Sequence, residues 1–358
     1  EALTPHDISQ YLNREENNKR ADQVLQTIEY NQNTYMILIS PITLQKKLNG
    51  YCSFVFKNNE DYKANYSQMI IDKVSSICAL SLFYEKTKID SFEQMKSLFF
   101  REILKGQISS NEEIIAKANL FHLDLSKPYY ISVLEYNKES KEYQQEIEFR
   151  KELFNLVTEY STRQKLKYLI HQKEKKIFFL FPLESIDESS PSFFEDLYHE
   201  IRMKLPMCNL YIGVSKKTLS INQANHACKN AIAALRMAFK GKRIVFFESL
   251  GVVGALINEK NEHDVREMAY SLLGKIEVQS QKDLDLIQTL YAFLWNGGNL
   301  EKTADDLTLS ISGLRYRIHK IEERLDKDLR SPIVSHQLLM SIQALIMLGD
   351  LDMKANVI

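Results

Sequence analysis

The feature that most constrains this chain is a series of amphipathic helical patterns between residues 283 and 345, separated by turn signals. Apolar residues recur at helical spacing over Asp283–Trp295, and Asn296-Gly297-Gly298 ends that pattern. Asn299 is placed to cap a short helix, and Ser310 to cap a longer one. The buried stripe predicted for the longer helix is Leu314, Ile318, Ile321 and Leu325. We therefore predict a compact all-helical unit here.

This order of elements is that of a helix-turn-helix, in which a short helix, a tight turn and a longer helix let the second helix enter a DNA major groove. Ala304 lies where the two helices are expected to cross, and only a small side chain fits at such a crossing. Between Leu309 and Ile321 there are basic residues but no acidic one, in a chain whose formal net charge is -1. A local basic patch of this kind predicts a DNA-reading surface.

Most of the candidate DNA-binding residues lie at the two helix caps or on the outward side of the longer helix, reached by stepping about 100° per residue from its buried stripe. Gly313 lies in the first turn of that helix, and Arg317 lies near the edge of the buried stripe. They are Asn299, Ser310, Ser312, Gly313, Arg315, Tyr316, Arg317, His319 and Lys320. Other roles remain open for four of them. Arg317 could instead lay its stem over the core, and Tyr316 could pack on the preceding helix. His319 could be a plain exposed residue, and Gly313 either admits a phosphate or is simply tolerated.

The first hundred residues contain strand patterns followed by a long helical pattern. Met36–Ser40 and Tyr51–Phe56 are rich in strand formers, and Asn49-Gly50 between them is a tight-turn signal. From Tyr66 to Leu104 the pattern is helical, without Gly or Pro, as one helix or as two separated near Asp90-Ser91. Its apolar face is either a dimer seam or a surface that packs on its own domain.

Strand and helix patterns then alternate. Strands are expected at Tyr129–Leu134, Lys167–His171, Ile177–Phe181, Leu210–Val214 and Ile244–Phe247, and helices after the cap signal Ser109-Ser110-Asn111 and over 147–162, 193–205 and 224–238. Ser220 and Gln223 have the spacing of a capping box. Small residues line one face of the helix that follows, which would allow close packing against a sheet. No strand is expected after Val265.

Specific motifs resemble one family. The segments Gly297–Leu307 and Leu314–Leu325 are similar to the C-terminal helix-turn-helix of the PucR/CdaR family of bacterial transcription regulators, through Gly-Gly-Asn, Thr-Ala and Leu-Arg-Tyr-Arg. A second resemblance is to the degenerate GGDEF-like domain of that family, through the segments Leu123–Tyr130, Gly213–Ser215, Ala227–Ala231 and Phe246–Gly251. The residues before this domain resemble the tail of a GAF-type sensor. Family members usually begin the recognition helix with a His-Arg-Asn-Thr type sequence, where this chain has Ser310–Gly313. Either the operator is unusual, or DNA binding is weak and carried by Arg315, Tyr316, Arg317 and Lys320.

The predicted fold is an α+β multidomain chain. It comprises a partial GAF-like sensor at 1–64, connecting helices at 65–106, a degenerate GGDEF-like domain at 107–278 and an all-α helix-turn-helix domain at 279–358. The sequence begins at Glu1 rather than Met, which leaves room for an upstream domain.

The expected function is ligand-responsive transcription control. The expected partners are a double-stranded DNA operator, an unidentified small-molecule effector and a second copy of the chain; the resemblance implies control of metabolite genes such as those of purine catabolism. The alternative is an interaction scaffold whose helix-turn-helix no longer binds DNA. Catalysis is not expected, because the turn His171–Lys176 has no Gly and one acidic residue to hold metal and triphosphate. No catalytic residue, metal or cofactor is expected.

The spacing of the four cysteines indicates the state of the thiols, and the hydropathy pattern indicates the cellular location. Cys52, Cys78, Cys208 and Cys228 show neither CxxC nor zinc-ligand spacing, so buried free thiols are expected. The sequence has no uncharged apolar run long enough for a membrane span and no signal-peptide pattern at its start, so we expect a cytoplasmic protein without membrane contact.

Overall fold

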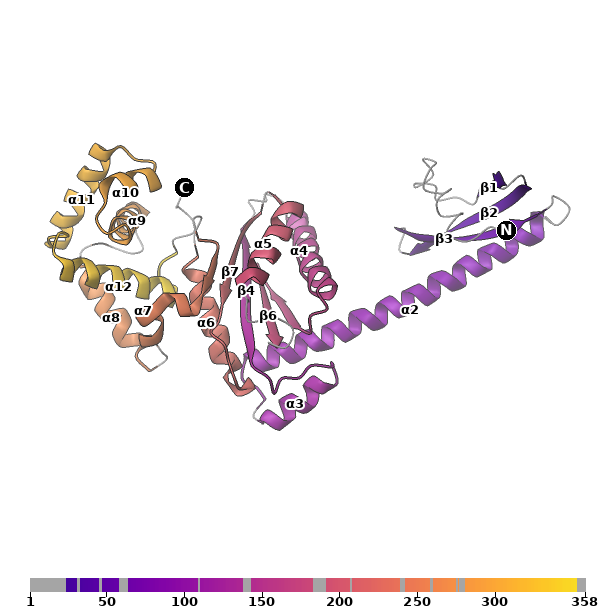
Figure 1. Cartoon of the computed structure of the whole chain (residues 1–358), viewed down its shortest axis with the longest axis horizontal. Helices are drawn as coiled ribbons and strands as arrows, with labels where there is room; N and C mark the ends of the chain where they lie inside the picture. The colour runs from indigo at the N-terminus through magenta and orange to yellow at the C-terminus, as the bar shows by residue number, and fades with distance from the viewer. Residues whose placement is uncertain are drawn as a thin grey trace. The chain divides into compact units, whose positions relative to one another are not determined.

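The computed structural model describes residues 24–30, 33–44, 47–57, 64–108, 110–137, 143–182, 191–206, 208–238, 242–257, 260–274, 276 and 281–352. The chain divides into two compact units, Glu1–Met95 and Lys96–Ile358, coloured from indigo to yellow in Figure 1. Helices and strands are both present, as predicted for an α+β chain. Ser109 of the predicted cap signal, the Gly241 end of the small-residue helix and the first 23 residues of the predicted sensor lie outside the described residues.

The first unit contains an antiparallel sheet in the order β1-β2-β3, formed by Val24–Tyr30, Asn33–Leu44 and Lys47–Phe56. The tight turn predicted at Asn49-Gly50 is wrong, because both residues lie within β3 and Gly50 pairs with Ile42. A shift of register between Ile42 and Thr43 lets the pairing continue past that point. The long helical pattern forms the single helix α2, Ala64–Leu104, so the alternative of two helices is excluded.

The second unit is built on a sheet with strand order β5-β6-β4-β7-β8, antiparallel except for the parallel pair β7 and β8. Its strands are β4 Tyr129–Asn137, β5 Leu169–Lys173, β6 Lys176–Pro182, β7 Asn209–Val214 and β8 Ile244–Phe246. The helix α3 Asn111–Asn119 precedes β4, and α4 Tyr143–Arg163, α5 Pro191–Lys204 and α6 Ala224–Arg236 lie between the strands. Each predicted strand of this region is found. β4, β6 and β7 are longer than predicted, β5 is shifted by two residues toward the C-terminus, and Phe247 lies beyond the end of β8.

Both faces of this sheet are buried, and alternate residues of each strand point to opposite faces. Ile131 and Val133 of β4 belong to the core on the α6 side, whereas Leu134 and Tyr136 belong to the core with α4 and α5. The arrangement is visible in Figure 1, where α6 lies on one side of the sheet and α4 and α5 on the other.

The helix α6 lies very close to β7, as its small residues predicted. A Cβ built on Gly213 would stand 2.2 Å from the Ala231 carbonyl oxygen, so only glycine fits there. The capping box predicted at Ser220 and Gln223 is wrong, because Ser220 makes no side-chain cap bond. A 3-10 turn, Ile221–Gln223, precedes α6, so the amide that the Ser220 hydroxyl would bind is not presented as in an α-helix.

The C-terminal region is helical: after a 3-10 turn at Phe247–Leu250 come α7 Gly251–Leu256, α8 Glu262–Leu273, α9 Gln281–Trp295, α10 Leu300–Asp306, α11 Ile311–Leu325 and α12 Pro332–Leu348. Ala269, Leu273 and Ile276 share one core with α9 to α12. This core therefore begins before residue 279, the boundary predicted from sequence. None of the helices among the described residues has the length and apolarity needed to span a bilayer.

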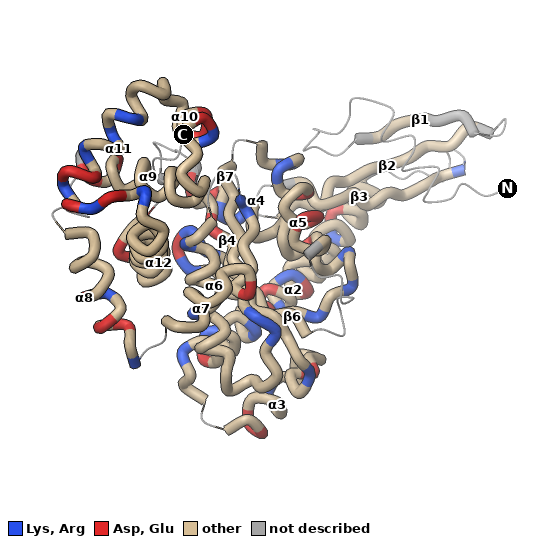
Figure 2. Tube along the Cα trace, turned by 60° about the vertical axis from the view of Figure 1, so that its left-hand side comes forward, with Lys and Arg blue, Asp and Glu red and all other residues tan. Residues whose placement is uncertain are grey.

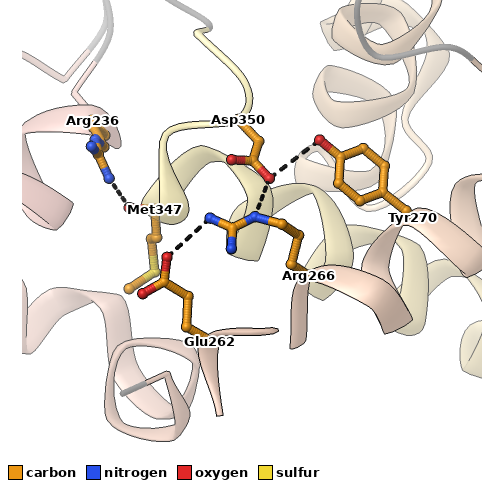
Figure 3. A network of polar contacts seen from close by, with 6 residues as sticks. All are labelled: Arg236, Glu262, Arg266, Tyr270, Met347 and Asp350. Atoms are coloured by element: carbon orange, nitrogen blue, oxygen red, sulfur yellow. Dashed lines mark hydrogen bonds and ion pairs between the residues drawn. The ribbon is translucent and has the colours of Figure 1, made fainter. Parts of the chain in front are cut away.

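Polar contacts connect α6 of the central region to the end of α12 (Figure 3). Arg236 Nη1 donates to the Met347 carbonyl oxygen at 2.6 Å. Gly349 ends α12 at a φ of 86°, and a Cβ there would stand 2.6 Å from Arg236 Cζ. Asp350 then accepts from Arg266 Nε at 2.6 Å and from the Tyr270 hydroxyl at 3.2 Å. The last turn of α12 is thus bonded to both α6 and α8.

Candidate nucleic-acid interface

The predicted helix-turn-helix is formed by α10, a short turn and α11. Thr308 takes a left-handed conformation, with a φ of 52°, and reverses the chain. The Leu309 amide donates to the Ala304 carbonyl oxygen at 2.9 Å, which closes the end of α10. Thr303 and Ala304 are buried, so the small residue predicted at the helix crossing is confirmed.

Both predicted helix caps are confirmed by their hydrogen bonds. Asn299 Oδ1 accepts from the Lys302 amide at 3.0 Å, and Ser310 Oγ accepts from the Gly313 amide at 3.1 Å. Ser310 Oγ also lies 3.2 Å from Ser312 Oγ. A Cβ at position 313 would stand 3.1 Å from Ser310 Oγ, so the close approach of the capping side chain favours glycine at this position. Asn299 thus fixes the start of α10 and Ser310 the start of α11, and any DNA contact that they make is additional.

The predicted buried stripe of α11 is also confirmed. Leu314, Ile318, Ile321 and Leu325 belong to the core formed with α9 and α12. Two further contacts hold this helix: Arg324 Nη1 donates to Asp283 Oδ1 of α9, and Glu322 Oε1 accepts from the Leu329 amide at 3.1 Å. A third contact holds α10, where Asn296 Nδ2 donates to Asp306 Oδ2 at 2.7 Å. Several acidic residues near the basic segment are thus engaged within the domain.

The outward side of α11 is exposed, and its basic residues stand out in blue in Figure 2. Ser312 and Arg315 are exposed, Lys320 is half-buried, and Tyr316 is 70% exposed. Packing of Tyr316 against the preceding helix is therefore excluded. His319 is exposed, and its Nδ1 lies 3.4 Å from Glu323 Oε1. The basic residues among them are complementary in charge to phosphate.

Arg317 differs from the other basic residues of α11. It is half-buried, and its Nη1 donates to Thr289 Oγ1 of α9 at 3.3 Å. Thr289 is fully buried, and its hydroxyl donates to the Asp285 carbonyl oxygen at 2.7 Å. Of the two roles left open by the sequence, the structure supports the one in which Arg317 joins α11 to α9.

Two exposed residues beside this surface were not predicted. Lys302 lies in the first turn of α10, and Ile311 is 43% exposed at the start of α11. The basic character of Lys302 and its place directly after a cap would have indicated it, because the first helix of such motifs crosses the phosphate backbone. No comparable signal marked Ile311, since an apolar residue in a first turn is ordinarily assigned to the core.

The β5–β6 hairpin is the place in the central sheet where the sequence argues against catalysis. The β5–β6 hairpin turns at Glu174 and Lys175, as predicted, with Glu174 at a φ of 53°. Among the described residues there is no group of three or more His, Cys, Asp or Glu side chains that could hold a metal ion.

Comparison with known proteins identifies two regions. A model of the GGDEF-like domain matches residues 105–237, and a model of the PucR C-terminal helix-turn-helix domain matches residues 286–344, which include α10 and α11. Among solved structures, the chain is similar to the regulator of polyketide synthase expression from Bifidobacterium adolescentis, with 14% identity and a TM-score of 0.33. That match covers 70% of this chain and 97% of the other. No curated protein matches.

Proposed function

Because the chain carries a GGDEF-like domain followed by the helix-turn-helix domain of PucR-type regulators, we propose that it is a ligand-responsive, DNA-binding transcription regulator of the PucR/CdaR type. The observation that carries this proposal is the exposed outward side of α11, with Arg315 exposed and Lys320 half-buried. The genes under control belong to metabolite catabolism, purine catabolism being one example, and the protein acts in the cytoplasm.

The helix α11 enters the major groove, and its side chains divide by role. Arg315 and Lys320 pair with phosphates or with guanine edges, for which arginine offers two parallel donors. Tyr316 and Ser312 provide hydroxyl groups, and His319 offers a ring nitrogen. Asn299, Ser310 and Gly313 face the DNA backbone from the helix starts at which they lie. Arg317 holds α11 against α9.

A second copy of the chain completes the DNA-binding unit, because two-fold operators are bound by dimers at half-sites about 34 Å apart or a multiple of that. The helix α2 supports this part of the proposal. Ile77, Leu80 and Tyr84 are 66%, 67% and 69% exposed, at the three- and four-residue spacing of a coiled-coil seam. An apolar stripe exposed on one long helix is stabilised when a second copy covers it.

Ligand control requires that a change in the sensing part reach α11. The bonds from Arg236 to Met347, and from Arg266 and Tyr270 to Asp350, attach α12 to α6 and α8 (Figure 3). Since α12 shares a core with α11, a shift of α6 relative to α12 would alter the support of the reading helix. An effector that binds the N-terminal or the central domain can act through this connection.

We also propose that the central domain is not an enzyme. The β5–β6 hairpin lacks the glycine-rich turn and paired acids that the cyclase-like reaction needs. Turnover of a nucleoside triphosphate with Mg²⁺ by the purified chain, abolished by changes in that hairpin, would overturn this part.

The deciding experiment compares DNA binding by the wild type, by Arg315→Ala/Lys320→Ala and by a matched control, Lys327→Ala/Arg330→Ala. Both double variants remove two positive charges, but Lys327 and Arg330 lie beyond the C-terminal end of α11. Anisotropy of a labelled duplex is recorded over a salt series. We expect the first variant to lose affinity and to flatten the salt dependence by about 0.9 per lost phosphate contact, with the control close to wild type. Equal behaviour of all three proteins would instead favour the interaction scaffold.

A further inference from the structure

Two cysteines of the first unit face one another across the contact between the sheet and α2. Cys52 on β3 and Cys78 on α2 are 26 positions apart in sequence, yet their Sγ atoms lie 3.8 Å apart. Both are half-buried, contrary to the burial expected from sequence, whereas Cys208 and Cys228 are buried as expected. The two sulfur atoms need to approach by less than about 2 Å to reach the disulfide bond length of about 2.05 Å.

The register of the strands makes this approach a defined feature of the packing. Ser40 and Cys52 are direct partners across β2 and β3. The Ser75 hydroxyl donates to the Ser40 carbonyl oxygen at 3.5 Å, and Ser40 Oγ lies 3.4 Å from Asp72 Oδ1. Ser75 and Cys78 are three residues apart and so share one side of α2. Neighbouring strand residues therefore meet neighbouring positions of the helix, and Ile71, which lies on the same side of α2 one turn before Ser75, is fully buried.

The two sulfurs are not equivalent. Contact with Cys52 raises the pKa of Cys78, because the hydrogen bond between the two sulfurs favours the Cys78 thiol, and burial and the charge of a Cys52 thiolate act in the same direction. We take Cys52 as the attacking sulfur and Cys78 as the resolving sulfur, and the serine variants described below test that order.

We propose that Cys52 and Cys78 are a reversible modification site, a dithiol that a hydroperoxide converts into an intramolecular disulfide. The Cys52 thiolate attacks the terminal peroxide oxygen, which gives a sulfenic acid and releases the alcohol, or water from hydrogen peroxide. Cys78 sulfur then attacks the Cys52 sulfur and expels hydroxide, which takes up the thiol proton as water. Two thiols are oxidised by two electrons, and one peroxide is reduced. A dithiol reductant reverses the reaction by exchange.

The disulfide would tie β3 covalently to α2. In the reduced chain this contact consists of apolar packing and weak hydrogen bonds, which can separate. In the oxidised chain the helix is held to the sheet at a fixed point. The site thus couples the oxidation state of the surroundings to the freedom of α2 within the first unit, independently of whether the chain binds DNA.

The test uses the full-length reduced chain, treated with hydrogen peroxide and then with N-ethylmaleimide. We expect a monomeric product that has lost two hydrogens and takes up maleimide only at Cys208 and Cys228 after unfolding, with a crosslink between the peptides of Cys52 and Cys78. Cys228 serves as an internal control, because burial raises the pKa of its thiol to about 12. Dithiothreitol should restore all four thiols.

Two serine variants separate the roles. Cys78→Ser should stop at a Cys52 sulfenic acid that dimedone traps, and Cys52→Ser should react with peroxide several-fold more slowly. Either variant is judged only after its circular dichroism matches that of the wild type. The proposal is overturned if peroxide yields Cys52 sulfinic acid without the crosslink in the wild type. A disulfide joining two chains, or an unreacted Cys52–Cys78 pair, would overturn it as well.

Discussion

Arg317 provides the sharpest test of which basic residues of α11 support the fold and which are available to DNA. Its sequence position would suit a phosphate contact, but in the structure its Nη1 donates to Thr289 Oγ1 at 3.3 Å. A hydrogen bond that involves a charged group is worth about 1.5–3 kcal/mol. Because this bond is long and Arg317 is half-buried, we expect the low end of that range. Arg317→Ala should therefore lower the free energy of unfolding of the C-terminal region by about 1.5 kcal/mol.

The chain offers a convenient probe, since Trp295 is its only tryptophan and ends α9, the helix that carries Thr289. Urea unfolding followed by Trp295 fluorescence reports on the helical core. A double-mutant cycle with Thr289→Val isolates the pair, and we expect a coupling energy of about 1 kcal/mol. Arg315→Ala is the matched control, because Arg315 is exposed and its loss should change the unfolding free energy by no more than about 0.5 kcal/mol.

In a DNA-binding assay the order of the two effects should be reversed: the loss of Arg315 should matter and the loss of Arg317 should not. Arg315→Ala should flatten the dependence of log affinity on log salt by about 0.9, whereas Arg317→Ala should leave that slope unchanged. The reasoning would be refuted if Arg317→Ala flattened the slope as much as Arg315→Ala while showing no coupling to Thr289. In that case Arg317 would be a phosphate contact and its bond to α9 incidental.

Three further outcomes are expected. Gly213→Ala should destabilise the central region by about 3 kcal/mol or more, measured by urea unfolding, because its Cβ would collide with the Ala231 carbonyl oxygen; a gain of stability would contradict the close approach of α6. Burial, aided by nearby cations, lowers the pKa of His171 below its unfolded value, so the free energy of unfolding should fall as the pH drops through about 6.5. A His171→Gln variant that retains the full pH dependence would exclude this cause. Ser310→Ala should cost about 1 kcal/mol by losing the bond to the Gly313 amide, whereas Ser310→Asp should keep that stability and weaken DNA binding; equal DNA affinity of both variants would place position 310 away from phosphate.

Local patterns predicted much of the fold because local chemistry determines it. The caps at Asn299 and Ser310 depend on an amide two or three residues away, and both were predictable from that spacing. The same logic failed where tertiary packing overrides it. Asn49-Gly50 lies within β3 because pairing with β2 extends past it, and a 3-10 turn displaces the cap expected at Ser220.

Contacts between distant positions could not be predicted in this way. The pair Cys52 and Cys78 depends on how α2 packs on β3, and the bond from Arg317 to Thr289 spans 28 positions. Helical periodicity places Arg317 at the edge of the buried stripe, where both roles satisfy the pattern. Only the position of α9 decides between them. Residues at the edges of a helical face are thus the ones for which sequence reasoning about a site is least decisive.

The division of charge on α11 predicts how strongly the proposed DNA binding depends on salt. With Arg317 engaged in the core, each helix-turn-helix presents Arg315 and Lys320 to DNA, and a two-fold pair of chains presents four such cations. At about 0.9 per phosphate, four contacts give a slope near -3.6, or roughly a 150-fold loss of affinity between 50 and 200 mM salt. A slope clearly steeper than this would require further cations, and the exposed Lys302 at the start of α10 is placed to supply them. A slope near -3.6 would instead leave α11 as the main contact, with specificity depending on the few side chains of its outward side.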